Sequence, residues 1–346
     1  MTALGDRIAA LIAAEGPLTI AQFMTLALLD PKDGYYATRD PFGRQGDFVT
    51  APEVSQMFGE LVGLWLAQVW QDQGKPARPL LVELGPGRGT LMADALRALK
   101  LVPELRDQIA VELLEASPVL AGKQCEMLAD AGVPLRWVTE LSGVSGDRPL
   151  LVVANEFFDA LPIRQYVMTE RGWCERMVTL DAAGALAFGL SPAGIAVPGR
   201  GDAPPGGVYE VSRAGEAVAE EISHRIAGQG GGALIVDYGY DVPGFGETLQ
   251  AVASHAFADV LRGAGLTDLS AHVDFPALAA AAERGGARVH GPVGQGTFLR
   301  ALGIEQRAKR LEQADALARL TAPDRMGTLF KALAIVPKSA PPPPGF

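Results

Sequence analysis

The sequence predicts a doubly wound α/β fold with an N-terminal helical segment and an inserted subdomain. From residue 80 onward, short and continuously apolar runs alternate with amphipathic helical patterns, which is typical of a parallel sheet covered by helices on both faces. This alternation stops after residue 162 and resumes near residue 231, so residues 163–230 are expected to be inserted between two strands of one sheet. Residues 1–78 are mostly helical in pattern and are expected to form a cap and lid segment.

The N-terminal segment contains three helical patterns, which are IAALIAA near residue 8, TIAQFMTLAL, and VSQMFGELVGLWLAQVWQDQG. In the longest one, apolar residues recur at spacings of three and four and predict one buried helical face. These residues are Phe58, Leu61, Val62, Trp65, Leu66 and Val69. The stretch between the second and third patterns is rich in Gly, Pro and Asp and is expected to be largely loop.

The domain expected over residues 79–336 combines strands and helices in alternation. Its strands are expected at LLVEL (80–84), IAVELLEAS (109–117), PLRWV (134–138), PLLVVAN (149–155), GGALIVDYG (231–239) and TLFKALAIV (328–336). Its helices are expected at GTLMADALRALK (89–100), PVLAGKQCEMLADAG (118–132), GEAVAEEISHRIA (215–227) and EQRAKRLEQADALARL (305–320). Period-two stretches inside the insertion predict antiparallel strands. The tail, residues 337–346, ends in PPPPGF and is expected to be flexible, with no core to join.

The composition argues against several classes of protein. With 30 basic and 40 acidic residues the net charge is −10, which does not favour a surface that neutralises nucleic-acid phosphates. Cys125 and Cys174 lie far apart and form neither a disulfide framework nor a zinc motif. His224 lies on an amphipathic helix, and the His-x-Asp pair at His272 lacks a third ligand at metal spacing, so no metal is expected.

The start of the chain and its longest uncharged run bear on location. MTALGDRIAALIAAEG has neither the basic-then-apolar order of a secretory signal nor the acid-poor composition of a transit peptide. The longest uncharged run, residues 182–199, contains four glycines and two prolines, which does not suit a membrane span. We therefore expect a cytoplasmic protein without a membrane span.

The stretch LVELGPGRGT (81–90) places three alternating glycines, Gly85, Gly87 and Gly89, directly after a predicted strand. A dinucleotide fingerprint, G-x-G-x-x-G, would need its third glycine where Thr90 stands, and no GK[ST] follows to make a Walker loop. Glu83 precedes the first glycine by two residues. A carboxylate there would repel a pyrophosphate and attract an ammonium or sulfonium group.

The next predicted strand ends in LLEAS, which places Glu115 and its neighbour Ala116 at the same edge of the sheet. A carboxylate in this position can accept both hydroxyls of a ribose. Glycines and two acids at successive strand ends favour S-adenosylmethionine as the ligand. The alternative is a plain tight turn with two solvated acids.

A polar cluster follows the strand at 149–155, where ligands bind in open α/β sheets. Asn155, Glu156 and Asp159 flank Phe157 and Phe158. We predict that the three polar residues are catalytic and that Asn155 also contacts the cofactor. The alternative is a helix N-cap with the two phenylalanines in the core.

Two further regions contribute candidates. Residues 34–56 precede the glycine loop and are predicted to fold over the cofactor as a lid, with Asp47 and Thr50 as cofactor contacts; a surface loop is the alternative. His255, which flanks the last third of the sheet, is a candidate catalytic residue.

Four segments together resemble one family. They are GDFVTAPEVSQMFGE (46–60), LVELGPGRGTLMAD (81–94), LLEASP (113–118) and VVANEFFDALP (152–162). The family is that of the mitochondrial complex I assembly methyltransferases, also known as the mitochondrial dysfunction protein A family, with its bacterial relatives. AHVDF (271–275), GQGTFL (294–299) and FKALA (330–334) also resemble its later segments, so the resemblance covers most of the chain.

This resemblance implies a class I S-adenosylmethionine-dependent methyltransferase with a Rossmann-like, seven-stranded sheet. For the eukaryotic members it implies symmetric dimethylation of an arginine on a respiratory complex I subunit, and hence a protein substrate. By position, Glu83 and the three glycines resemble the first cofactor motif, and Glu115 resembles the ribose acid. Residues 155–159 match the acidic segment after the fourth strand. The chain shows no mitochondrial presequence, which fits a bacterial member.

If the acceptor is arginine, Glu156 is expected to be the principal substrate-binding residue, because a carboxylate orients a guanidinium through paired hydrogen bonds. Asp159 would add a second contact, and Phe157 or Phe158 would wall the site. Three alternatives stay open, namely a small-molecule methyltransferase, a non-catalytic S-adenosylmethionine-binding assembly factor, and a nicotinamide enzyme, against which Thr90 counts. The insertion is expected either to select the acceptor or to form a subunit contact, as in a homodimer.

Overall fold

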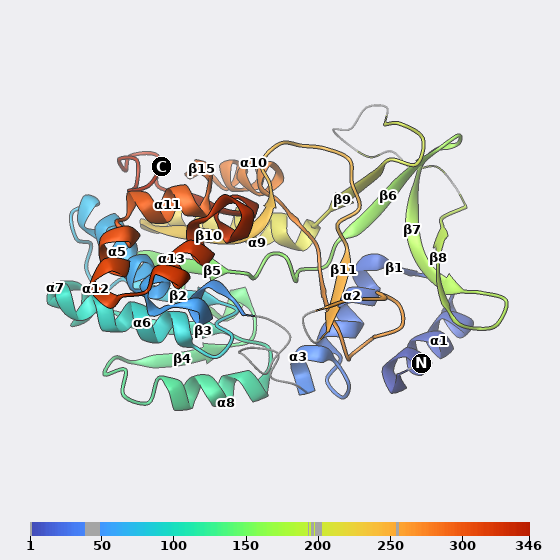
Figure 1. Ribbon diagram of the computed structural model, residues 1–346, viewed down its shortest axis with the longest axis horizontal. Coiled ribbons are helices and arrows are strands. Elements are labelled where there is room, and N and C mark those ends of the chain that lie inside the picture. The colour runs from blue at the N-terminus through green and yellow to red at the C-terminus, as the bar shows by residue number, and fades with distance from the viewer. Residues whose placement is uncertain (1, 39–48, 193, 195–196, 198–202, 254–255) are drawn as a thin grey trace. The chain divides into compact units, whose positions relative to one another are not determined.

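The computed structural model describes residues 2–38, 49–192, 194, 197, 203–253 and 256–346 (Figure 1). The chain divides into two compact units. The first unit comprises Met1–Pro41, Asp159–Gly215 and Val242–Asp274, and the second comprises Phe42–Phe158, Glu216–Asp241 and Phe275–Phe346. Each unit has its own buried hydrophobic cluster.

A mixed sheet forms the centre of the second unit. The strands on its main path are β2 (Leu80–Leu84), β3 (Ala110–Leu114), β4 (Leu135–Val138), β5 (Leu150–Asn155), β10 (Gly231–Tyr240), β15 (Arg288–Gly294) and β16 (Phe330–Val336). They are ordered β15-β16-β10-β5-β2-β3-β4. The five strands from β10 to β4 pair in parallel, whereas β16 is antiparallel to both of its neighbours. The predicted doubly wound sheet is therefore confirmed. Only β15 was missed, because this edge strand is half-exposed and has no continuous apolar run.

Helices surround this sheet (Figure 1). They are α4 (Ala51–Val54), α5 (Gln56–Asp72), α6 (Thr90–Ala98), α7 (Pro103–Arg106), α8 (Pro118–Met127), α9 (Arg213–Gln229, from Glu216 onward), α10 (Phe275–Gly285), α11 (Gln295–Ala301), α12 (Ile304–Leu311) and α13 (Ala314–Thr321). The single helix predicted over 305–320 is two helices, since Glu312 adopts a left-handed φ of 56° that ends α12. Next to this break, Gln313 accepts a hydrogen bond of 2.6 Å from the Ser55 hydroxyl.

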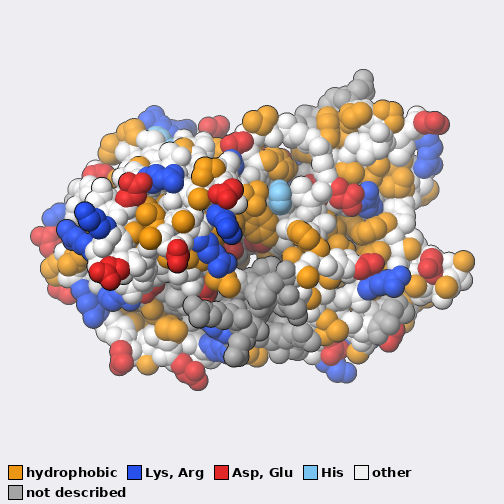
Figure 2. Space-filling view, in the orientation of Figure 1, with side chains coloured by type: hydrophobic (Ala, Val, Ile, Leu, Met, Phe, Trp, Pro, Cys, Tyr) orange, Lys and Arg blue, Asp and Glu red, His pale blue; other side chains and the backbone are white. Residues whose placement is uncertain are grey.

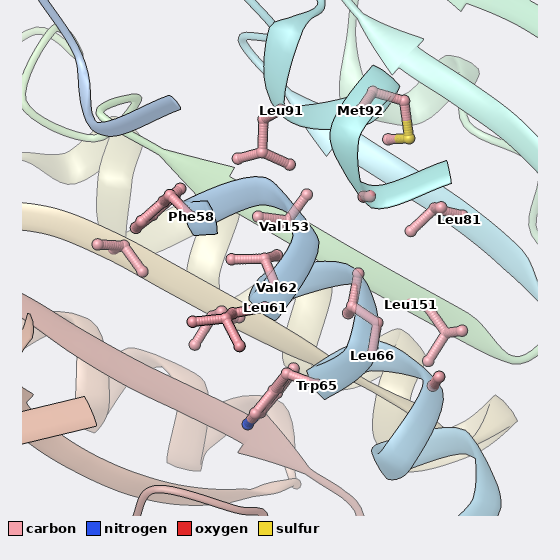
Figure 3. Packing of buried hydrophobic residues seen from close by; sticks show 14 of the residues in the cluster. Phe58, Leu61, Val62, Trp65, Leu66, Leu81, Leu91, Met92, Leu151 and Val153 are labelled. Carbon is pink, nitrogen blue, oxygen red and sulfur yellow. The ribbon is translucent and has the colours of Figure 1, made fainter. Parts of the chain in front are cut away.

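The apolar face predicted on α5 is the main packing surface of the second unit. Figure 3 shows Phe58, Leu61, Val62, Trp65 and Leu66 among residues of β2, β5 and α6. Two glycines on α5 allow α6 to come close, because a Cβ on Gly59 would lie 2.6 Å from the Cβ of Asp94 and one on Gly63 would lie 2.7 Å from the Cα of Ala95. These contacts hold α6, and with it the end of the glycine loop, firmly against α5.

The C-terminal tail corrects one expectation. The indole nitrogen of Trp65 donates a hydrogen bond of 3.0 Å to the carbonyl of Pro344. The ring of Phe346 lies 6.4 Å from that of Trp65 and 5.3 Å from that of Phe298. The expectation that this tail has no core to join is wrong, because its last residue is aromatic and its prolines still offer carbonyl acceptors.

The first unit combines three helices with antiparallel strands, as predicted for the insertion. The elements are α1 (Ala3–Glu15), β1 (Leu18–Thr19), α2 (Ile20–Leu29), α3 (Tyr35–Thr38), β6 (Arg164–Thr169), β7 (Gly172–Leu180), β8 (Leu186–Leu190), β9 (Val208–Val211), β11 (Gln250–Ala253), β12 (Ala256–Ala258), β13 (Asp268–Ser270) and β14 (Val273–Asp274). One sheet has the order β1-β7-β6-β9, with β8 also on β7, and a second has the order β12-β11-β13. Residues 1–41 thus group with the insertion, whereas α4 and α5 belong to the second unit. The domain boundaries at 78, 163–230 and 336 stay a prediction.

Candidate functional site

The glycine loop lies where the strand order of the sheet reverses. Successive strands β2, β3 and β4 extend the sheet in one direction, and β5 and β10 extend it in the other. Leu84 of β2 pairs with Ala154 of β5, so the loops that follow these two strands begin side by side. In open α/β sheets, this reversal is the place where ligands bind.

The three glycines of this loop all have positive φ. The values are 62° for Gly85, 55° for Gly87 and 84° for Gly89, which forms the N-cap of α6. Residues with a Cβ rarely adopt this left-handed region. In addition, a Cβ on Gly85 would lie 2.9 Å from the Cδ2 of Phe157, which follows β5. Both the loop's conformation and its approach to the neighbouring turn therefore require glycine.

A pocket of about 390 Å³, part of it open to solvent, lies against the loop. The residues that line it are Thr50, Pro52, Glu53, Glu83, Gly85, Pro86, Gly87, Arg88, Thr90, Leu91, Asn155 and Glu156. The structure thus brings together the predicted residues from the glycine loop, from the end of β5 and from position 50. Sequence reasoning missed Glu53, which accepts a hydrogen bond of 3.1 Å from the hydroxyl of Thr90.

Glu83 is a buried acid with an unsatisfied oxygen. Its side chain is 3% exposed, and its Oε2 has no hydrogen-bond partner among the described residues. Burial, with the charge of nearby Glu115 as a second cause, raises the pKa of Glu83 to about 8. A buried ionisable group without a partner is costly. A cation bound in the pocket would relieve this cost.

Glu115 is held in one orientation by two donors. Its Oε1 accepts a hydrogen bond of 2.7 Å from the amide of Ser117, and its Oε2 accepts one of 2.9 Å from the side chain of Gln124. Burial raises the pKa of Glu115, although these hydrogen bonds act in the opposite direction. Gln124 was not predicted. Its signal in the sequence is a polar residue one helical turn after Leu120, on the buried face of α8.

The turn after β5 holds Glu156 in an unusual conformation. Glu156 has a φ of 51°, and such a left-handed residue other than glycine typically costs about 1–3 kcal/mol and is often found at functional sites. Its Oε1 accepts hydrogen bonds from the amide of Ala51, at 3.0 Å, and from the side chain of Asn155, at 3.2 Å. Asn155 is 8% exposed, and its Oδ1 has no hydrogen-bond partner in the described part of the chain.

Asp237 of β10 stabilises the same turn and was also missed. Its Oδ2 accepts hydrogen bonds from the amides of Phe157, at 3.1 Å, and Phe158, at 2.9 Å, and its side chain is fully buried. A charged residue inside the apolar run GGALIVDYG was the available signal. No helix begins in the fully described stretch 155–164, so the helix N-cap alternative is wrong.

Some predicted residues do not line the pocket. Gly89 belongs to the same loop as the lining residues Gly85 and Gly87. Glu115 is linked to Gly87 through hydrogen bonds to the side chain of Gln124, whereas Ala116 is exposed after the end of β3. Asp159 belongs to the first unit, where it is buried and its carbonyl accepts a hydrogen bond of 3.0 Å from the amide of Ala271. Asp47 and His255 lie outside the described residues.

Three further features concern metal ions, membranes and surface charge. Within the described ranges, no group of three or more His, Cys, Asp or Glu side chains is placed to hold a metal ion. No described helix combines the length and the apolar character that a membrane crossing requires. On the face shown in Figure 2, basic and acidic side chains of the described residues are interspersed rather than gathered in a basic patch.

The sheet order and the pocket define a class of enzyme. A glycine loop follows the first strand of the sheet, an acid follows the second, and a polar turn follows the fourth, with one antiparallel strand inserted near the edge. These features are those of a class I S-adenosylmethionine-dependent methyltransferase.

Comparisons with known proteins agree. The chain belongs to the family described as putative S-adenosyl-L-methionine-dependent methyltransferases, whose model matches residues 61–293. It is 36% identical over 365 residues to the mitochondrial protein arginine methyltransferase NDUFAF7 of Homo sapiens, covering 94% of this chain and 81% of that protein. It is 37% identical over 382 residues to the homolog of Drosophila melanogaster, covering 96% of this chain and 85% of that protein.

A solved structure is also similar. It is that of a likely methyl transferase from Burkholderia thailandensis bound to S-adenosyl-homocysteine, with a TM-score of 0.85, 30% identity, and coverage of 99% of this chain and 94% of that one. The fold and family predicted from the four segments are therefore confirmed. The chain is an S-adenosylmethionine-dependent methyltransferase and not a nicotinamide enzyme.

Proposed function

We propose that this enzyme transfers a methyl group from S-adenosylmethionine to an arginine of a protein. The observation that carries the proposal is the buried Oε2 of Glu83, which has no hydrogen-bond partner among the described residues and lies beside a loop of three left-handed glycines. Among the described residues that line the pocket, three carry a carboxyl group (Glu53, Glu83 and Glu156) and one, Arg88, is basic. This balance favours ligands that carry positive charge.

The residues present fit the cofactor. Glu83 would accept the ammonium group of its methionine part, since that carboxylate oxygen has no hydrogen-bond partner among the described residues. Glu115 would accept the ribose hydroxyls, and Asn155 would offer to an N–H donor its Oδ1, which has no partner in the described part of the chain. When bound, S-adenosylmethionine supplies a methyl group on a positively charged sulfur. The protein contributes positioning and electrostatic stabilisation.

Glu156 is the proposed binding residue for the acceptor arginine. A guanidinium is planar and permanently charged, and it donates in pairs to a carboxylate. Because Oε1 of Glu156 already accepts hydrogen bonds from Ala51 and Asn155, the rotamer of this carboxylate is set before the acceptor arrives. In the proposed site Phe157 or Phe158 forms a wall.

A protein substrate is supported by the names of the relatives, which are protein arginine methyltransferases. A respiratory complex I subunit as this substrate rests on the family resemblance of the four sequence segments. Those relatives are mitochondrial by name. The homodimer and the cytoplasmic location stay predictions from the sequence.

Calorimetry with S-adenosylmethionine tests the cofactor site first. We expect wild-type binding, and binding about 10- to 100-fold weaker in Glu83→Gln and Glu115→Ala, because each loses a hydrogen bond that involves a charged group. Glu112→Gln is the matched control, since Glu112 is equally buried but is fully paired with Arg136 and Ser145. Absence of wild-type binding would contradict the assignment of the pocket.

Labelling tests the acceptor. Respiratory-complex subunits are incubated with the enzyme and methyl-labelled S-adenosylmethionine, and the label is located by mass spectrometry. We expect methylated arginine in one of these proteins. Label found only in small molecules would favour the small-molecule alternative, and cofactor binding without any labelled product would favour the non-catalytic assembly factor.

A further inference from the structure

We propose that Gln124 is a positioning residue for the cofactor, which fixes the carboxylate of Glu115 to the glycine loop and thereby determines how strongly the ribose hydroxyls are bound. This inference rests on the proposed role of Glu115. Gln124 touches neither the pocket nor the reacting atoms, so its effect on the cofactor is transmitted through residues that do.

The side chain of Gln124 is fully buried and makes three hydrogen bonds. Its Nε2 donates to the carbonyl of Gly87 at 2.8 Å and to Oε2 of Glu115 at 2.9 Å. Its Oε1 accepts from the indole nitrogen of Trp137 at 2.8 Å. Three neighbouring structures, the loop after β2, the end of β3 and strand β4, are thus joined by one amide.

Chemistry fixes the direction of this amide. An indole nitrogen can only donate, so the oxygen of Gln124 must face Trp137. The NH₂ group then faces Gly87 and Glu115, which both accept, and both of its hydrogens are used. A flipped amide would place oxygen against a carbonyl and a carboxylate, which is repulsive. The carbonyl oxygen of Gly87 and Oε2 of Glu115 are consequently held at a fixed distance from one another.

The other oxygen of Glu115 is held independently, by the amide of Ser117 at the start of α8. A carboxylate has about four acceptor positions, and a ligand can use only those left after the hydrogen bonds from Ser117, Gln124 and the backbone amide of Ala116. With the carboxylate plane fixed, these positions point in a set direction. Without Gln124 only backbone amides hold the carboxylate, so its plane is less firmly fixed.

Gln124 also packs against the loop itself. A Cβ on Gly89 would lie 3.6 Å from the Cα and Cγ of Gln124 and 3.7 Å from its Cβ. The side chain therefore binds the loop at Gly87 and lies near it at Gly89. Leucine or methionine would fill this space but would leave Oε2 of Glu115, the carbonyl of Gly87 and the indole of Trp137 without their hydrogen bonds. Glutamate would add a second negative charge beside Glu115.

The test compares the affinity for S-adenosylhomocysteine with that for its 2′-deoxy and 3′-deoxy analogues, measured by calorimetry. In the wild type, removal of a hydroxyl that Glu115 binds is expected to weaken binding by about 10-fold or more. Gln124→Met is expected to bind the parent compound about 10-fold less tightly. Its affinities for the parent compound and for the deoxy analogues should differ much less than those of the wild type, which we call a lower dependence on the hydroxyl. Glu115→Gln should behave in the same way as Gln124→Met.

Gln73→Met is the matched control, because Gln73 makes two hydrogen bonds to the backbone of Gly231, at 2.7 and 2.9 Å, and does not line the pocket. This variant should keep the wild-type dependence on the hydroxyl. Trp137→Phe removes only the indole donor and is expected to lower the dependence partially. It also carries the test if Gln124→Met does not fold.

The outcomes separate the two proposals. In one outcome, removal of the hydroxyl weakens binding equally in the wild type and in Gln124→Met but has little effect in Glu115→Gln. In that case Glu115 keeps its role and the inference about Gln124 is wrong. If the wild type binds the deoxy analogues as tightly as the parent compound, the ribose role of Glu115 is wrong and the inference falls with it. If the wild type binds no S-adenosylhomocysteine, the cofactor assignment itself fails.

Discussion

The backbone amide of Ala51 donates a hydrogen bond of 3.0 Å to Oε1 of Glu156, which joins the start of α4 to the turn after β5. Both residues lie in the second unit, and Thr50, Glu53 and Glu156 line one pocket. The segment before α5 therefore helps to orient the carboxylate that we assign to the acceptor.

This relationship predicts a separation of binding from turnover. Glu156→Gln keeps the size of the side chain and an acceptor oxygen for Ala51 but removes the charge that would pair with a guanidinium. We expect kcat to fall by about 10- to 100-fold, the effect of one charge-assisted hydrogen bond, with cofactor affinity within about 2-fold of wild type. Methyl-transfer kinetics and calorimetry measure the two quantities. Full turnover in this variant would remove Glu156 from the acceptor site.

A second prediction concerns the closest approach in the glycine loop. Gly85→Ala combines a positive φ of 62° with a Cβ only 2.9 Å from Phe157. We expect the free energy of unfolding to fall by about 2–4 kcal/mol, from left-handed strain together with the displaced ring. Gly74→Ala is the control, because Gly74 has a φ of 78° but no atom within 4 Å of its Cβ position. It should lose about 1–2 kcal/mol. Equal losses in urea unfolding would show that the contact with Phe157 is unimportant.

The sequence predicted the parallel strands and the residues that end them because both signals are local. An apolar run such as LLVEL indicates a buried strand by itself, and the acid or glycine that follows is read directly. Gly85, Glu83 and Asn155 were therefore found without knowledge of the fold, and the structure places all three at one pocket.

The parts of the site that the sequence did not predict depend on pairing between distant segments. Gln124 lies 37 residues from Gly87, and Asp237 lies 80 residues from Phe157, with which each forms its hydrogen bond. Each is a polar residue on a buried face. Such a residue must have a hydrogen-bond partner, but the sequence does not show which residue the partner is. The tail was misjudged for the same reason, since Trp65, which binds Pro344, is 279 residues away.

A third prediction addresses the support of the polar turn. Asp237→Ala leaves the amides of Phe157, Phe158 and Tyr238 without their acceptor, that of Phe158 in a buried place and the other two in partly buried places. We expect a loss of about 2–5 kcal/mol in the free energy of unfolding, because each buried and unsatisfied donor costs about 1–3 kcal/mol and the turn relaxes in part. Turnover should fall as well, since Glu156 belongs to this turn. Asp241→Ala is the control, because Asp241 pairs with Lys331 and is half exposed. A variant at position 237 as stable as this control would contradict the supporting role.

The last prediction follows from the pKa of Glu83, which is about 8 in the folded chain against an ordinary value of 4.5. Because the folded state binds this proton more tightly, the corresponding stability is fully present below about pH 4.5 and is lost as the pH rises through 8. The loss amounts to about 1.4 kcal/mol per pH unit, or on the order of 5 kcal/mol in total.

Glu83→Gln has no such proton, so its free energy of unfolding should exceed that of the wild type increasingly from pH 6 to pH 9, when both are measured by urea unfolding without cofactor. Saturating S-adenosylhomocysteine should narrow this difference, because its ammonium group favours the ionised carboxylate that the variant lacks. Glu112→Gln, whose glutamate has its pKa lowered by hydrogen bonds from Ser145 and Arg136 despite burial, should not gain on the wild type as the pH rises. Parallel pH profiles for the wild type and Glu83→Gln would show that Glu83 is ionised in the free enzyme and that its charge is already compensated.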